Sequence, residues 1–172
     1  MTKKSPDIKK ISLLAIFTSL SLLLSYIEFL LPPLFAAVPG IKLGLPNIAI
    51  IFLLYRCGVK DAAIVSFIRL SLSSLLFGSA VSFAYSLAGA VLSLTVMVIM
   101  KSLKLFSSVS VSISGGVMHN LGQILVAVLL LDTPKIAYYM IVLAVTGTIS
   151  GAFVGVCGAS LVNKVPAKFT KG

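Results

Sequence analysis

Residues 32–56 read PPLFAAVPGIKLGLPNIAIIFLLYR, a segment in which four of the seven prolines of the chain precede a short apolar run. The run from Asn47 to Tyr55 has nine residues and, at about 1.5 Å per residue, covers about 14 Å, half of a hydrocarbon core. Irregular backbone at membrane depth is tolerated only where protein buries it or where it lines a cavity. The segment therefore predicts a short or broken second helix, the kind of element that points to a binding site.

The chain around this segment is too apolar to cover itself with polar groups. Its 172 residues are 59% hydrophobic and 10% charged, with a mean hydropathy of +1.15, whereas about a quarter of the residues of a soluble domain are charged. This composition excludes an ordinary globular enzyme, a disordered tail and a disulfide-stapled module. About 20 apolar residues make one spanning helix, so the length allows about five or six. We expect one transmembrane domain over residues 1–172.

The apolar runs predict an all-α integral membrane protein, a compact bundle of six helices. The first run follows a polar, cytoplasmic N-terminus over residues 1–10 and ends at Leu31-Pro32-Pro33. A signal peptide would have a shorter hydrophobic region and a small-residue cleavage site, so this run is expected to be retained. The expected spans are about 11–31, 41–55, 61–77, 82–100, 114–131 and 135–162, and residues 163–172 form a cytoplasmic tail.

The positive charges give the orientation of these spans. The net charge of +10 comes from residues at the ends of apolar runs. They do not form a basic face interleaved with aromatic residues, so no nucleic-acid partner is expected. With the N-terminus inside, Lys42 and Lys135 alone fall outside, and the cytoplasmic segments hold Lys3, Lys4, Lys9, Lys10, Arg56, Lys60, Lys101, Lys104, Lys164, Lys168 and Lys171. This bias predicts that both termini are cytoplasmic.

One arginine lies inside a predicted span. An ionisable side chain there costs at least about 2.5–3.5 kcal/mol on insertion scales, which makes Arg69 a functional candidate. Ser66 and Ser73 share its helix face. Two interpretations remain open: the guanidinium binds an anionic ligand such as a carboxylate or phosphate, or it forms a structural ion pair with Glu28, the only acid inside a span.

Further polar residues are candidate cavity walls. His119 and Gln123 share one face of the fifth predicted helix and Asn120 adjoins them; they either line a pocket or serve as hydrogen-bonded packing residues. Near the proline-rich break, Lys42 is either a cation at the mouth of an outward-facing cavity or a snorkelling side chain, and Asn47 follows it.

Metal and disulfide chemistry are not expected. No histidine, cysteine or carboxylate stands at a metal-ligand spacing, so no metal and no cofactor is predicted. Cys57 and Cys157 form no framework and are interpreted as reduced packing residues.

Small residues indicate where helices approach closely. The last predicted helix carries Gly147, Gly151, Gly155 and Ala159 at strict i, i+4 spacing. Such a ridge either packs inside the bundle or forms a docking face for another protein. Ala15 and Ser19 share one face of the first helix.

Four motifs in order resemble the Gx transporter family, which is also described as heptaprenyl diphosphate synthase component I. They are the segments 41–49 (IKLGLPNIA), 69–79 (from Arg69 to Ser79), 86–90 (SLAGA) and 118–123 (MHNLGQ). The resemblance covers about residues 10–162. The family in turn resembles the substrate-capture (S) components of energy-coupling factor (ECF) transporters of the bacterial cytoplasmic membrane, which bind a nutrient and topple on a transmembrane T subunit driven by two ATPases. By that resemblance Ala15 and Ser19 would form the docking surface.

The predicted function is therefore substrate binding for an ECF-type importer without enzymatic activity. Prenyl transfer needs aspartate-rich Mg²⁺ sites, and the three aspartates of this chain are isolated. The residues expected to contact a small anionic nutrient, or an isoprenoid or quinone precursor, are Arg69, Asn47, His119, Asn120 and Gln123, with Lys42 and Glu28 as secondary candidates. The alternative is an accessory subunit that anchors a soluble prenyl diphosphate synthase. An importer needs Arg69 in an occluded pocket, whereas an anchor needs a lateral groove and a cytoplasmic patch.

Overall fold

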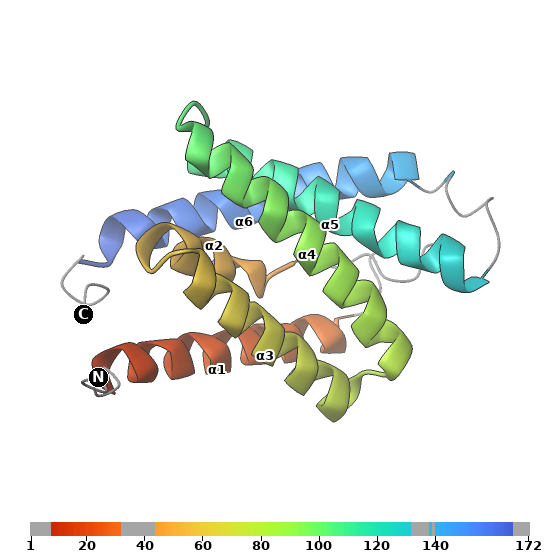
Figure 1. Ribbon diagram of the computed structural model, residues 1–172, viewed down its shortest axis with the longest axis horizontal. Helices are drawn as coiled ribbons and strands as arrows, with labels where there is room; N and C mark the ends of the chain where they lie inside the picture. The colour runs from red at the N-terminus through yellow and green to blue at the C-terminus, as the bar shows by residue number, and fades with distance from the viewer. Residues whose placement is uncertain (1–7, 32–43, 132–137, 139, 167–172) are drawn as a thin grey trace, which may run out of the picture.

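The computed structural model describes residues 8–31, 44–131, 138 and 140–166, and within these it is all-helical (Figure 1). The helices are α1 (Ile8–Leu30), α2 (Asn47–Arg56), α3 (Val59–Phe77), α4 (Ala80–Leu103), α5 (Ser108–Leu131) and α6 (Met140–Lys164). The predicted six-helix, all-α membrane bundle is confirmed. Four of the helices, α1, α4, α5 and α6, are long and apolar enough to cross a membrane, so the chain is a multi-pass membrane protein.

The short helix α2 lies in the middle of the bundle, between α6 and the α1–α3 pair (Figure 1). Each residue from Ala49 to Leu54 is at most 5% exposed. The Phe52 ring stacks on Phe17 of α1, with ring centroids 4.6 Å apart. A helix too short to cross lipid by itself is thus enclosed by longer helices, which is the condition under which an interrupted segment is tolerated at membrane depth.

Glycines set the close contacts of α5 with its two neighbours. A Cβ atom added to Gly122 would lie 2.7 Å from the carbonyl oxygen of Ala88 on α4. A Cβ added to Gly151 on α6 would lie 2.7 Å from the Cα of Ile113. At such positions only glycine lets the backbones meet, which is how helices associate where lipid offers no hydrophobic drive.

The predicted small-residue ridge of α6 faces α5 rather than lipid along most of its length. Gly147, Gly151 and Gly155 are buried against α5, while Ala159 is half-buried. This favours packing inside the bundle over docking of another protein. On α1, by contrast, Ala15 and Ser19 are both exposed on the outer surface. That outer surface carries many apolar side chains, among them Leu75 at 83% exposure and Leu129 at 80%.

Two basic residues bind the ends of helices at the side of the bundle where α1 begins and α6 ends (Figure 1). Arg56, at the end of α2, donates to the carbonyl oxygens of Val162 and Val165 at the end of α6. Lys101 of α4 donates to the carbonyl oxygen of Leu54 at 2.5 Å. Cations at helix C-termini satisfy carbonyl groups that have no partner within the helix. These residues therefore have a packing role in addition to the topological role that the charge bias predicted.

A half-buried ion pair and a free cysteine lie near the turn between α2 and α3. Lys10 of α1 lies 2.9 Å from the carboxylate of Asp61, whose side chain is 6% exposed. Cys57 is a free, half-buried cysteine, and burial, with the Asp61 carboxylate, raises the pKa of its thiol. A raised pKa disfavours the reactive thiolate, in keeping with the interpretation of Cys57 as a packing residue.

Several helix bounds differ from the expected spans. Helix α4 continues to Leu103 and α5 already begins at Ser108, so the expected separator over 101–113 shrinks to 104–107. The serine-rich sequence at this point predicts a loop. In the structure these serines begin the helix: Ser107 caps its first turn by accepting a hydrogen bond from the Ser110 backbone N–H at 3.1 Å. The first residues expected in the second and sixth spans, 41–43 and 135–137, lie outside the described residues, as do most of residues 1–10 and 163–172.

The contact of α6 with α2 yields a stability prediction. A Cβ on Gly158 would overlap the side chain of Ile51, which is 1% exposed. We expect Gly158→Val to destabilise the folded protein by about 1–3 kcal/mol, because an overfilled core must shift its backbone. Thermal unfolding in detergent should show a lower Tm for Gly158→Val and an unchanged Tm for Ser160→Val, at an exposed α6 position. A partial recovery in the double variant Gly158→Val/Ile51→Ala would tie the loss to this contact; an unchanged Tm in Gly158→Val would contradict it.

Candidate functional site

A cavity of about 60 Å³ lies where the start of α2 meets α1, α3 and α5. It brings together six of the seven residues predicted to contact a substrate: Glu28, Asn47, Arg69, His119, Asn120 and Gln123. The seventh, Lys42, lies outside the described residues. The other lining residues are Ser25, Gly44, Pro46, Leu70, Ser73, Phe77, Ser86, Gly116 and Ser150.

A tight turn before α2 positions two of these side chains. Gly44 has a φ of +70°, a left-handed conformation that favours glycine, and its carbonyl accepts a hydrogen bond from the Asn47 backbone N–H at 2.9 Å. The Gly44 N–H in turn donates to the Glu28 carboxylate at 2.5 Å, which joins the turn to α1. The proline-rich break thus presents Asn47 at the first residue of α2, beside the cavity.

Arg69 is the charged centre of the cavity. It projects from the middle of α3 and is 8% exposed. Its Nη2 donates to Oδ1 of Asn47 at 3.4 Å, and its buried Nε has no hydrogen-bond partner among the described residues. A guanidinium carries five N–H donors. Arg69 thus contacts Asn47 and Glu28 contacts the Gly44 backbone, and the Glu28 carboxylate also attracts the Arg69 guanidinium electrostatically.

The α5 wall combines a fixed amide with two half-buried polar side chains. Asn120 donates from Nδ2 to the Leu143 carbonyl of α6 at 2.6 Å, so this residue also holds α5 to α6. His119 lies against Gly89 of α4, where an added Cβ would come within 2.9 Å of Nδ1. Gln123 lies one turn further along α5 and is half-buried.

Sequence analysis missed several small polar residues of the site. Ser25, Ser86 and Ser150 line the cavity from three further helix positions. The signal available for them is the recurrence of serine within apolar runs, but serine is also common in helix packing. Only the three-dimensional arrangement separates the serines at the cavity from those elsewhere.

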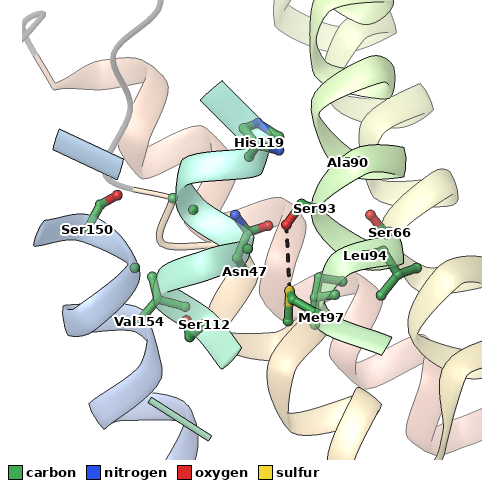
Figure 2. A pocket seen from close by; sticks show the side chains of 15 residues that line it. Asn47, Ser66, Ala90, Ser93, Leu94, Met97, Ser112, His119, Ser150 and Val154 are labelled. Carbon is green, nitrogen blue, oxygen red and sulfur yellow. Dashed lines mark hydrogen bonds between the residues drawn. The ribbon is translucent and has the colours of Figure 1, made fainter. Parts of the chain in front are cut away.

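A second, inner cavity of about 40 Å³, the one shown in Figure 2, adjoins the first. The two share five lining residues: Gly44, Asn47, Gly116, His119 and Ser150. Beyond Asn47 and His119 the inner cavity is bordered by the apolar side chains of Ile50, Leu94, Met97 and Val154, with serines between them. The site therefore changes from a charged and amide-lined part to a mainly apolar part.

This arrangement is suited to binding an anion. The described residues contain no group of three His, Cys, Asp or Glu side chains placed to hold a metal ion. A buried guanidinium whose Nε has no hydrogen-bond partner among the described residues, next to amide and hydroxyl groups, matches the planar oxygens of a carboxylate or phosphate.

Comparison with known protein families gives one result. The model of the family described as heptaprenyl diphosphate synthase component I matches residues 17–161, from within α1 to within α6. No curated protein and no solved structure matches the chain. A family described as a component of a prenyl synthase agrees with the prediction that this chain is not itself the enzyme.

The Gly44 turn yields a second stability prediction. A side chain at φ +70° is strained, and a Cβ there would lie 3.3 Å from Nδ2 of Asn47. We expect Gly44→Ala to cost about 1–2 kcal/mol, the usual penalty for a left-handed residue with a Cβ. Gly44→Asn should cost less, because asparagine adopts this conformation more readily. The Tm of both variants in detergent measures the difference; equal values for Ala and Asn would argue against strain at this turn.

Proposed function

The chain belongs to the heptaprenyl diphosphate synthase component I family, and from that premise we propose that it is a membrane subunit that binds a small anionic ligand in the Arg69 cavity. The four long apolar helices make it a multi-pass membrane protein, and a bacterial cytoplasmic membrane is consistent with its family. The family description supports association with a prenyl synthase.

One observation carries the proposal: a guanidinium that is 92% buried borders a cavity with its Nε unpartnered among the described residues. Burying a charge without a full set of hydrogen bonds is costly, and an ionisable side chain inside a membrane bundle is by default a candidate for a ligand or ion pathway. Asn47, Gln123 and His119 add neutral donors and acceptors that can orient a carboxylate or phosphate.

The finer form of the proposal is an S component of an ECF-type importer. In this role the exposed face of α1 with Ala15 and Ser19 docks on a transmembrane T subunit, and two ATPases supply the energy. The chain carries no phosphate-cradling Walker loop of its own. The buried position of the cavity supports capture of a ligand rather than an open channel.

A second candidate is an accessory subunit that holds a prenyl diphosphate synthase at the membrane. The family description favours it, and so does an apolar groove between α3 and α4. Lys104 and Lys164, both exposed at the end of the bundle that holds the described chain ends, would belong to its docking patch. The two candidates differ in whether the Arg69 cavity holds a ligand.

Native mass spectrometry of the protein purified in mild detergent tests the leading proposal. We expect a bound small molecule in the wild type and its loss in Arg69→Ala, because the guanidinium supplies the charge that holds it. Arg69→Lys should retain only part of the ligand, since an ammonium lacks the planar fork. Lys60→Ala removes an exposed cation from the same helix and should change nothing. A synthase co-purifying without any ligand, or a ligand retained in Arg69→Ala, would contradict the importer.

Asn47 offers a charge-based test of the same cavity. We expect Asn47→Asp to weaken binding of the co-purified ligand at least about tenfold, or about 1.4 kcal/mol, because the new carboxylate would occupy the guanidinium. Asn47→Ala removes the same hydrogen bond without adding charge and should weaken binding less. Titration calorimetry with the ligand that mass spectrometry identifies measures both, and equal losses in the two variants would rule out competition for Arg69.

A further inference from the structure

A third concave site, a groove on the outer surface, lies next to the inner cavity. It is an apolar groove between α3 and α4, of about 340 Å³, and is lined by Val59, Val91, Leu94, Thr95, Val98 and Ile99. Leu94 also lines the inner cavity, so its side chain is the partition between the inner cavity and the groove. Ser66, the residue by which α3 contributes to the inner cavity, lines that cavity together with Leu94 (Figure 2).

We propose that the ligand is an anionic amphiphile whose head binds at Arg69 and whose single apolar chain runs through the inner cavity, past Leu94, into the α3–α4 groove. The inference rests on the proposed function of the Arg69 cavity and adds the chemical class of the ligand. It also assigns a site, the groove, and a specificity-determining residue, Leu94.

The change of lining along the three hollows is the first argument. The Arg69 end is charged and rich in amides, whereas Ile50, Met97 and Val154 border the inner cavity. Two of the inner serines turn their hydroxyls to acceptors in the protein: Ser93 to the Met97 sulfur at 3.5 Å and Ser150 to the Gly147 carbonyl at 3.4 Å. Because these two hydroxyls already have acceptors within the protein, an apolar chain beside them breaks no hydrogen bond.

Size is the second argument. The inner cavity, at about 40 Å³, has room for roughly three water-sized groups. Only a short part of an apolar chain fits there, so the remainder must leave the bundle. The groove meets this cavity at Leu94, which lines both, and it is almost free of polar surface, because its lining is aliphatic apart from Thr95. A chain lying in it exchanges lipid contacts for protein contacts at little cost.

Binding measurements in lipid nanodiscs test the proposal with three probes that share a phosphate: farnesyl monophosphate, dimethylallyl monophosphate and inorganic phosphate. Leu94→Trp should fill the space between the inner cavity and the groove and so weaken farnesyl monophosphate binding at least about tenfold. The affinities of the two short probes should change less than about twofold. Leu94→Ala should keep all three affinities. Val81→Trp, at an exposed position of α4 outside the groove, is the matched control. Comparing variants at one lipid concentration cancels the partitioning of the probe into the bilayer.

The outcomes separate this inference from the proposed function. If the short probes bind in an Arg69-dependent way but farnesyl monophosphate does not bind, the amphiphile is overturned and the anion site stands. The same holds if farnesyl monophosphate binds with an affinity that Leu94→Trp leaves unchanged. Equal weakening of all three probes by Leu94→Trp would overturn the role of Leu94 as a partition for the chain. Absence of Arg69-dependent binding for every probe would overturn both the amphiphile and a phosphate-binding site.

Discussion

The structure depends on the burial of a helix that is too short to cross a membrane. A ten-residue helix leaves polar backbone groups at both ends, and lipid cannot satisfy them. At one end Lys101 and the turn at Cys57 and Gly58 take up the last carbonyl groups. At the other, the Gly44 turn connects to Glu28, and Asn47 connects to Arg69. The need to enclose α2 thus brings the polar side chains of α1, α3 and α5 to one place.

The candidate site results from this arrangement. The cavity at the first residue of α2 is bordered mainly by side chains of the longer helices. Arg69 projects into that space from α3, and the glycine contacts of α5 with α4 and α6 place His119 and Gln123 opposite. The same close helix contacts that hold the bundle together therefore set the width of the cavity.

The residues of the site could be predicted to a large extent because ionisable and amide groups are rare inside apolar runs and so identify themselves. Arg69, Asn47 and His119 belong to this class. Serines at the cavity could not be told from serines in packing. The close approach of Gly158 to Ile51 depends on which helices are neighbours, which a single sequence leaves open. The extension of α5 to Ser108 was hidden because the residues around its first turn read as a polar loop.

The contacts of α2 also constrain how the protein can be made. Its Arg56 reaches the end of α6, 106 residues later in the chain, and Ile51 packs against Gly158 of the same helix. During synthesis α2 emerges long before either partner exists. A segment of ten residues cannot settle alone in lipid, so its final position is available only once the last helix has been inserted. The last step of biogenesis is therefore the packing of α2 into the middle of the bundle. Although α2 is the second of the described helices to be synthesised, it is among the last to reach its final position.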